Sequence, residues 1–234
     1  MPESKLRAIS HGSLIIDKIF LEIVDLIKMR HKFGLTEIEI ANQIKKLGKK
    51  FGAQGMAFPP IVSFGRSAVE IHHKPGKLRI GKNNFLMLDY GVKVSGYCSD
   101  FTRTLFIGTP NKEQERIYNI VLKSQLAAIK KTAPGKHADG IDFTARHIIN
   151  TSGFGKFYIH GTGHGVGKKI HEAPNFKPNS GDIIMENDVV TVEPGIYLPK
   201  KFGVRIEDMI LVKNKPEIFS KIPKDFGSMI INLK

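Results

Sequence analysis

The sequence predicts an α+β fold built from two similar halves, and the order of its patterns leads to this prediction. Patterns typical of two helices, then strands, then a strand pair rich in acidic residues occur in that order twice along the 234 residues. No low-complexity linker separates the two halves. We therefore expect one domain over residues 1–234, with both halves facing a shared site.

The first half is expected to begin with two helices. Apolar residues recur at helical spacing from Leu6 to about Met29. Thr36-Glu-Ile-Glu39 is a capping box, which predicts the start of a second helix. Two prolines then precede Ile61-Val-Ser-Phe64, a place where proline is tolerated before a strand. We expect Ser67 to His73 to be extended as well.

The first acidic strand pair covers residues 85–107, where two apolar runs flank a short polar turn. A hairpin with Val92 opposite Tyr97 places Asp89 opposite Asp100. Carboxylates that face each other across strands repel. Burying such a charge is costly unless it is paired or binds a metal. The pattern therefore requires a counter-charge beside the two aspartates.

Either basic side chains such as Arg103 and Lys93 supply that charge, or a cation does. A second strand pair over residues 189–212 has the same design and brings Glu193 opposite Glu207. Two opposed acid pairs need more positive charge than one arginine carries. Divalent cations suit hard oxygen ligands of this number.

The second half repeats the first. Residues from Asn111 to Lys131 predict a helix that ends before Pro134-Gly135. Another helix is expected from Asp139 to about Thr151, followed by a short strand from Phe157 to His160 and a glycine-rich turn.

Three histidines lie around that turn, in His160-Gly-Thr-Gly-His164-Gly-Val-Gly and at His171. The glycines argue against a helix, at about 1 kcal/mol each, and let the backbone approach a neighbour closely. One imidazole with four carboxylates is a suitable ligand set for two first-row divalent ions. His72 and His73 precede the first acidic pair, and the residues alone leave their role open.

Charge and composition exclude several classes of protein. The formal net charge is +14, but the lysines are scattered, and no basic helix or zinc-finger spacing predicts specific nucleic-acid binding. No apolar run reaches the roughly 18 residues of a membrane span, and no secretory signal follows Met1. The single cysteine, Cys98, fits a reducing compartment. We expect a cytoplasmic protein without a membrane partner.

The chain resembles the pita-bread metallopeptidases, and within them the Xaa-Pro aminopeptidase (aminopeptidase P) and prolidase branch, from its first helix to about Val212. The resemblance implies the pita-bread fold: two halves related by a pseudo-twofold axis, with a curved antiparallel sheet covered by helices. It covers the catalytic domain only, without the N-terminal domain usual in that branch. The motifs that carry it are Asp89-Tyr-Gly, Gly96-Tyr-Cys-Ser-Asp100-Phe-Thr-Arg-Thr, His160-Gly-Thr-Gly-His164-Gly-Val-Gly, His171-Glu-Ala-Pro, Val192-Glu193-Pro-Gly-Ile-Tyr and Gly203-Val-Arg-Ile-Glu207-Asp.

The resemblance also implies a metal site. Two divalent ions are expected, manganese first, with cobalt, zinc or iron as alternatives. Asp89 would chelate one ion, Asp100 and Glu207 would bridge both, and His164 and Glu193 would complete the other ion's shell. A hydroxide between the ions would be the nucleophile, with Glu193 as general base.

Further roles follow from the same resemblance. His72 would contact substrate and act in catalysis, and His171 would do the same by stabilising the tetrahedral intermediate. His160 would be a further substrate histidine. Apart from the resemblance, the place of Arg205 close to Glu207 in the chain leads us to expect that it lies on the other strand face and braces the site.

The expected function is hydrolysis of the N-terminal peptide bond of short peptides, with proline in the second position. A methionine aminopeptidase is the alternative, because the chain has the size of one, and a non-catalytic binding module of the same fold is a third. The partner is then a peptide substrate, and a homodimer stays open as the assembly.

Overall fold

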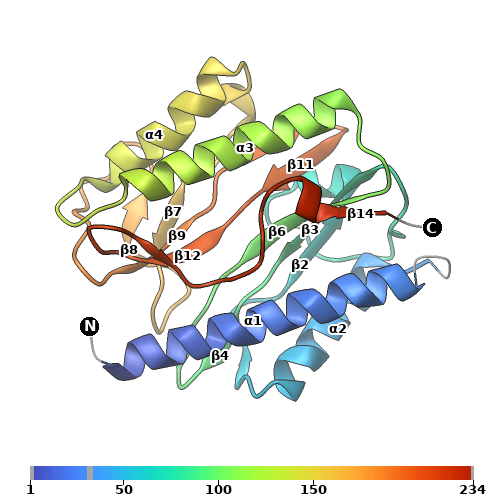
Figure 1. Cartoon of the computed structure of the whole chain (residues 1–234), viewed down its shortest axis with the longest axis horizontal. Coiled ribbons are helices and arrows are strands. Elements are labelled where there is room, and N and C mark those ends of the chain that lie inside the picture. The colour runs from blue at the N-terminus through green and yellow to red at the C-terminus, as the bar shows by residue number, and fades with distance from the viewer. Residues whose placement is uncertain (1–2, 31–33, 233–234) are drawn as a thin grey trace.

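Two pairs of helices flank the sheets in the computed structural model, which describes residues 3–30 and 34–232 (Figure 1). The first pair is α1 (Glu3–Arg30) and α2 (Glu37–Lys50), and the second is α3 (Lys112–Lys131) and α4 (Ala138–Thr151). All four helices were expected from the apolar periodicity, and their apolar faces pack into one continuous core. The α+β class is therefore confirmed.

Side-chain caps fix where two of these helices begin. The Oγ1 of Thr36 accepts from the backbone N–H of Glu39 at 3.3 Å, and the Glu39 carboxylate accepts from the Thr36 N–H at 2.8 Å. This is the predicted capping box of α2. Asn111 and Gln114 make the same reciprocal pair at the start of α3, at 2.9 Å in both directions. Each pair satisfies helix-terminal N–H groups that would otherwise lack acceptors.

The first half supplies a three-stranded sheet and three strands of a four-stranded sheet, whose remaining edge strand, β14, comes from the C-terminal end of the chain. The larger sheet has the order β14-β6-β3-β2, and its two central strands are almost entirely buried. The bounds are β1 (Gly55–Met56), β2 (Ile61–Phe64), β3 (Asn84–Asp89), β4 (Val92–Val94), β5 (Tyr97–Cys98), β6 (Thr102–Ile107) and β14 (Ile230–Ile231).

The second half supplies a five-stranded sheet of order β13-β12-β9-β7-β8 and a two-stranded ribbon of β10 and β11. An isolated bridge joins the halves, where the Glu207 N–H donates to the Thr102 carbonyl at 3.1 Å. The bounds are β7 (Gly163–Gly165), β8 (Glu172–Phe176), β9 (Val189–Val192), β10 (Gly195–Leu198), β11 (Phe202–Arg205), β12 (Asp208–Leu211) and β13 (Glu217–Ile218).

The two acidic strand pairs differ in how well their register was predicted. In the second pair, Asp208 lies opposite Val192 and Arg205 opposite Gly195, so the expected pairing of Glu193 with Glu207 is the correct register. In the first pair, Asp89 lies opposite Thr102, and the expected pairing with Asp100 is wrong by two residues. The cause is a tight turn between Val94 and Tyr97.

Both central residues of that turn, Ser95 and Gly96, have positive φ values of 48° and 78°. This is the conformation of the two-residue turns that match the twist of a hairpin. A shift of two residues keeps every side chain on its face of the sheet, so Asp89 and Asp100 still point to the same side.

Three local predictions are wrong. Residues 67–73 are not extended, because the chain forms a short 3-10 helix, η2 (Gly65–Val69), and then turns. Residues 157–160 are not a strand, since η3 (Gly155–Phe157) and irregular backbone occupy them. The glycine-rich turn contains a strand instead, β7, in the interior of the five-stranded sheet. The remaining 3-10 helix is η4 (Gly227–Met229).

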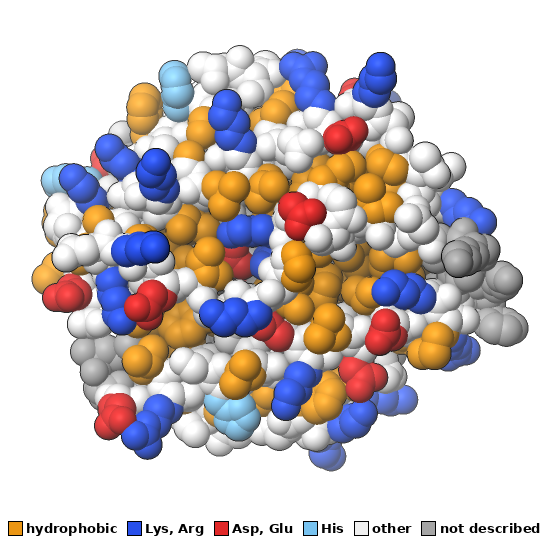
Figure 2. All heavy atoms as spheres, viewed as in Figure 1, with side chains coloured by type: hydrophobic (Ala, Val, Ile, Leu, Met, Phe, Trp, Pro, Cys, Tyr) orange, Lys and Arg blue, Asp and Glu red, His pale blue; other side chains and the backbone are white. Residues whose placement is uncertain are grey.

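Basic side chains are spread over the face seen in Figure 1 and do not gather in one patch (Figure 2). None of the helices in the described ranges has both the length and the hydropathy that crossing a membrane requires.

Candidate metal centre

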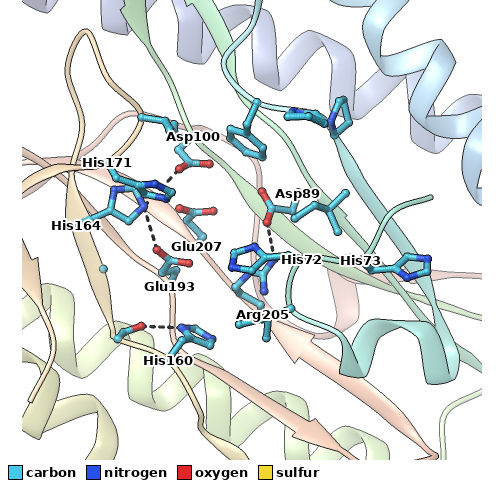
Figure 3. Close-up of a pocket in the computed structure, with 18 of the residues that line it drawn as sticks. His72, His73, Asp89, Asp100, His160, His164, His171, Glu193, Arg205 and Glu207 are labelled. Carbon is cyan, nitrogen blue, oxygen red and sulfur yellow. Dashed lines mark hydrogen bonds and ion pairs between the residues drawn. The ribbon is translucent and has the colours of Figure 1, made fainter.

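A cavity of about 520 Å³ lies where the two halves meet, and residues from both halves line it. Figure 3 shows the labelled acidic side chains and all of the labelled histidines except His73 converging on this space from different strands and loops. Each of the eight site residues expected from the sequence is among the lining residues, which include His72, Asp89, Asp100, His160, His164, His171, Glu193 and Glu207.

Three of these residues form a compact cluster. Ligand atoms of Asp100, His164 and Glu207 all lie within 4.8 Å of one another. Glu193 adjoins this cluster, since its Oε1 lies 3.2 Å from the Nε2 of His164, and the Oδ2 of Asp100 lies 3.7 Å from the same nitrogen. The four side chains combine three carboxylates with one imidazole, the donor types that first-row divalent metals accept.

Strand β7 positions His164, and its glycines explain how. A Cβ on Gly163 would lie 2.0 Å from the carbonyl oxygen of Thr191, and one on Gly165 would lie 2.1 Å from that of Ala173. Only glycine allows this close packing of neighbouring backbones. The Oγ1 of Thr191 accepts from the His164 N–H at 3.0 Å and donates to Glu193 Oε1 at 3.2 Å.

The bridge between the halves positions Glu207. The hydroxyl of Thr102 donates to Glu207 Oε2 at 2.7 Å. The guanidinium of Arg103, which is fully buried, donates to the Glu207 carbonyl and to Asp208. Arg103 therefore braces the backbone behind the site and is not the counter-ion of Asp89 and Asp100.

Arg205 lies in the cavity, which differs from the expectation that it would point to the other strand face. Its guanidinium forms an ion pair with Asp89 and donates to the hydroxyl of Tyr197 at 2.8 Å. Arg205 and Glu207 are two residues apart in the chain, and alternation along a strand places such residues on the same face. The expectation of opposite faces therefore misread this spacing.

Two carboxylate oxygens in the cavity lack protein partners. Within residues 3–30 and 34–232, Asp89 Oδ1 and Glu207 Oε1 are buried side-chain oxygens without a hydrogen bond. Native proteins rarely leave buried polar atoms unsatisfied, and a bound ion is one explanation for such atoms. Both oxygens belong to residues expected to bind metal.

The electrostatics of the cluster also indicate a missing positive charge. Burial, together with neighbouring carboxylates, raises the pKa of Asp100 and of Glu207 well above their ordinary values. Burial opposes a charge on His164, yet its hydrogen bond to Glu193 and the charges of Glu193 and Asp100 outweigh burial and raise its pKa to about 9. A buried cluster that raises the pKa of its own carboxyl groups and of its histidine fits divalent cations well.

The remaining histidines differ in their surroundings. The ring of His171 lies edge-on to that of His164, with centroids 4.4 Å apart. His160 has its Nε2 2.7 Å from the Tyr197 hydroxyl and its Nδ1 2.7 Å from the Gly161 carbonyl, and burial lowers its pKa to about 4. His72 lies beside Asp89 and Arg205 in Figure 3.

Comparison with known proteins gives consistent matches. The profile described as "Metallopeptidase family M24" matches residues 7–214. An uncharacterised peptidase of Staphylococcus epidermidis is 40% identical over 223 residues, which cover 95% of this chain and 62% of that protein.

Two solved structures superpose closely. The X-Pro aminopeptidase of Thermotoga maritima has a TM-score of 0.92 and 34% identity over 99% of this chain and 64% of that one. The Xaa-Pro dipeptidase of Bacillus anthracis has a TM-score of 0.93 and 35% identity over 98% of this chain and 63% of that one. The chain thus spans less than two thirds of each of these three proteins. The expected pita-bread fold is confirmed by these superpositions.

Proposed function

The chain belongs to metallopeptidase family M24, and from that premise we propose that it is a dinuclear, metal-dependent aminopeptidase that cleaves the N-terminal residue from short Xaa-Pro peptides. One observation carries the proposal above the others. A buried set of acidic residues and one histidine converges on a cavity between the halves, and two of its oxygens have no partner in the part of the chain that the structure describes.

Five residues would hold the two ions. Asp89 and Glu207 each offer an unpartnered oxygen, and Asp100, His164 and Glu193 complete the set. Manganese is the first candidate, with cobalt, zinc and iron as alternatives. Bound divalent ions would supply an activated water at neutral pH and would polarise the scissile carbonyl.

The protein's own groups would then handle protons and substrate. Glu193 is ionised at neutral pH, because hydrogen bonding and charge from His164 outweigh burial and lower its pKa to about 2. Its carboxylate is the group we assign to take a proton from the attacking water and pass it to the departing amine. His171 and His72 lie in the cavity wall, where a ring N–H can donate to the developing oxyanion or to the peptide.

The names of the two structural neighbours support the Xaa-Pro substrate class, since one is an X-Pro aminopeptidase and the other an Xaa-Pro dipeptidase. His160 supports it too. With its Nε2 and Nδ1 both bonded inside the protein, this ring offers a flat surface and no free acceptor. Proline has no N–H that would need an acceptor.

The test is hydrolysis of matched peptides by the metal-free protein after addition of Mn²⁺, Co²⁺, Zn²⁺ or Fe²⁺. The panel holds Xaa-Pro dipeptides, Xaa-Pro-Yaa tripeptides and Met-Ala-Yaa tripeptides, and the released N-terminal residue is quantified. We expect metal-dependent cleavage of the proline peptides and little cleavage of Met-Ala-Yaa.

A preference for Met-Ala-Yaa would replace the proposal with a methionine aminopeptidase. Absence of cleavage with every ion, in a protein that binds metal, would favour a non-catalytic module of the same family. The dipeptides and tripeptides together also separate a dipeptidase from an aminopeptidase that needs a third residue.

A further inference from the structure

A carboxylate that is not among the proposed metal ligands or catalytic residues forms hydrogen bonds to the chain segment that carries His72. This segment runs from Phe64 to Leu78 and contributes Ile71, His72 and Pro75 to the cavity wall. After Phe64, which ends β2, it contains no strand and only the short helix η2. Irregular backbone needs hydrogen-bond partners from elsewhere if it is to keep one conformation.

Glu37, in the first turn of α2, supplies those partners. Its side chain is 1% exposed. Oε1 accepts from the Phe64 N–H at 2.9 Å and from the Ser67 hydroxyl at 2.5 Å. Oε2 lies 2.8 Å from the Nε2 of His73 and accepts from the Gly76 N–H at 3.1 Å.

The first turn of α2 adds two backbone bonds to the same segment. The N–H groups of Glu37 and Ile38 donate to the carbonyls of Leu78 and Gly76, both at 3.0 Å. These are N–H groups that a helix cannot satisfy internally. The positive end of the helix dipole also favours an ionised side chain at Glu37.

Strand β11 supports the segment from another side. A Cβ on Gly203 would lie 2.1 Å from the carbonyl oxygen of Ala68, so η2 packs directly on the strand that ends at Arg205. The segment is therefore fixed between α2 and β11, and the two backbone N–H groups bound by Glu37 lie before and after His72 in the chain.

We propose that Glu37 is a positioning residue for His72. Its four hydrogen bonds set the path of the segment and so the place of the His72 ring beside Asp89. The neighbouring His73, whose Nε2 faces Glu37, belongs to this anchor. This inference rests on the proposed function in one respect only, the assumption that His72 contacts substrate.

The chemistry requires a carboxylate at this position. The N–H groups of Phe64 and Gly76 can only donate, and toward an ionised carboxylate the Ser67 hydroxyl and a His73 ring with its proton on Nε2 donate as well. Glu37→Gln keeps the size but replaces one oxygen by an NH₂ group, which would face two donors. A displacement of about 1 Å at a catalytic group can cost about 10²-fold in rate even when the mutation is remote.

The test is a double-mutant cycle with the metal-loaded enzyme and an Xaa-Pro peptide. We expect Glu37→Gln to lower kcat/KM by about 10- to 100-fold. We expect the double variant Glu37→Gln/His72→Ala to match His72→Ala within about threefold, because the anchor has nothing left to position. In Glu37→Gln/His160→Ala, the fold-losses in kcat/KM of the two single variants should instead multiply. Multiplied losses with His72→Ala would overturn the proposal.

A matched control separates positioning from stability. Asp17 on α1 is also buried, and it accepts from the Ser220 hydroxyl at 2.6 Å and the Lys221 N–H at 2.8 Å, outside the cavity lining. Asp17→Asn should change Tm without coupling to His72→Ala. If Glu37→Gln fails to fold, Ser67→Ala serves instead. It removes the hydroxyl that bonds to Glu37 and to the Phe64 backbone but keeps the carboxylate, so it should give a smaller loss in the same direction.

A second readout needs no activity. In protein labelled with ¹⁵N-histidine, Glu37→Gln should shift or broaden the ring signals of His72 and His73 and leave those of His160 in place. Unchanged His72 signals would overturn the inference even in an active enzyme. If the wild-type chain cleaves no peptide with any ion, the proposed function fails and the NMR comparison still decides the role of Glu37.

Discussion

Arg205 and Asp89 form a buried ion pair in which Arg205, at the end of β11, reaches the last residue of β3 in the other half of the molecule. Arg205 contacts Oδ2 of Asp89, whereas Oδ1 has no partner among the described residues. The protein thus neutralises one side of this carboxylate and leaves the other available to a cation. This arrangement differs from a closed ion pair, in which both oxygens would be satisfied.

We expect Arg205→Met to lower the free energy of unfolding of the metal-free protein by about 3–5 kcal/mol, since it leaves a buried charge uncompensated. Saturating Mn²⁺ should recover part of this loss, because the ion supplies a second counter-charge. Urea unfolding with and without metal measures both quantities. The double variant Asp89→Asn/Arg205→Met is the control, and an equal loss with and without Mn²⁺ would contradict Asp89 as a ligand.

The four helices could be predicted from the sequence because their signals are local. Apolar spacing and the Thr36–Glu39 capping box need no knowledge of the rest of the chain. The register of the second strand pair could also be predicted, since one turn around Lys200 connects its strands. The register of the first pair was predicted wrongly by two residues. The turn that was expected and the turn that forms both place the same residues on the same face of the sheet, so the pattern of side chains does not distinguish them.

The wrong predictions for segment 67–73 and for the glycine-rich stretch share a physical cause. In both, contacts with residues distant in the sequence determine the local structure. Segment 67–73 turns because Glu37, about thirty positions earlier, binds Ser67 and His73. Strand β7 forms in a glycine-rich stretch because glycine permits close contact with the backbones of β9 and β8. The candidate ligands could be named from sequence, whereas the positions of Arg205 and Tyr197 in the cavity depended on the tertiary fold.

Glu207→Gln tests the metal site directly. This carboxylate is 2% exposed, and its Oε1 has no partner within the described residues. We expect the variant to bind fewer equivalents of Mn²⁺ by calorimetry. We also expect it to unfold at the same or a higher temperature than the wild type when both are metal-free, because it removes a costly buried charge. A lower Tm of the metal-free variant would indicate that Glu207 is structural.

The free energy of unfolding at acidic pH should depend on the ionisation of Glu37. Burial alone would raise its pKa, but hydrogen bonds from Ser67, from His73 and from two backbone N–H groups outweigh burial and lower it. In the unfolded chain the pKa of a glutamate is roughly 4.3. Because the folded-state pKa of Glu37 is lower, its ionised form stabilises the fold above that pH, and this stabilisation is lost as the pH falls through the folded-state pKa. The advantage of wild type over Glu37→Gln, roughly 1–3 kcal/mol near neutral pH, should therefore shrink below about pH 4.

Asp17→Asn provides a control in which the stability difference from wild type should depend on pH with the opposite sign. Burial is the largest influence on Asp17 and raises its pKa despite hydrogen bonds from Ser220 and Lys221. Wild type should therefore lose stability relative to Asp17→Asn as the pH rises through this range. Denaturant unfolding between about pH 3 and pH 7 measures both variants, and parallel trends for the two would contradict the assignment.

His171 should act in the reaction without binding metal. Its ring lies edge-on to that of His164 and its side chain is exposed in the cavity wall, so it can reach a substrate there. We expect His171→Ala to lower kcat by roughly 10²–10³-fold, the scale for loss of one oxyanion donor, with KM changed less. Metal content measured by elemental analysis should match the wild type. A fall in bound metal would make His171 a ligand.

Specificity for proline should depend on a chain of hydrogen bonds from Arg205 through Tyr197 to His160. Arg205 donates to the Tyr197 hydroxyl at 2.8 Å, which leaves the hydroxyl proton for His160 Nε2 at 2.7 Å, while His160 Nδ1 donates to the Gly161 carbonyl. His160 thus has no free acceptor. A substrate with an N–H at the second residue would bury that donor unpaired, at a cost of about 1–3 kcal/mol, whereas proline would not.

Two substitutions that should lower the proline preference by different routes test this specificity. His160→Ala should reduce kcat/KM on Xaa-Pro-Yaa more than on Xaa-Ala-Yaa, because it removes the flat surface beside the proline ring. Tyr197→Phe should instead free His160 Nε2 as an acceptor and narrow the preference for Xaa-Pro-Yaa by about tenfold, which corresponds to roughly 1.4 kcal/mol. Competition between the two peptides in one reaction gives the ratio directly. An unchanged ratio in Tyr197→Phe, in a variant that still cleaves peptide, would show that the hydrogen bond to Tyr197 does not set the preference.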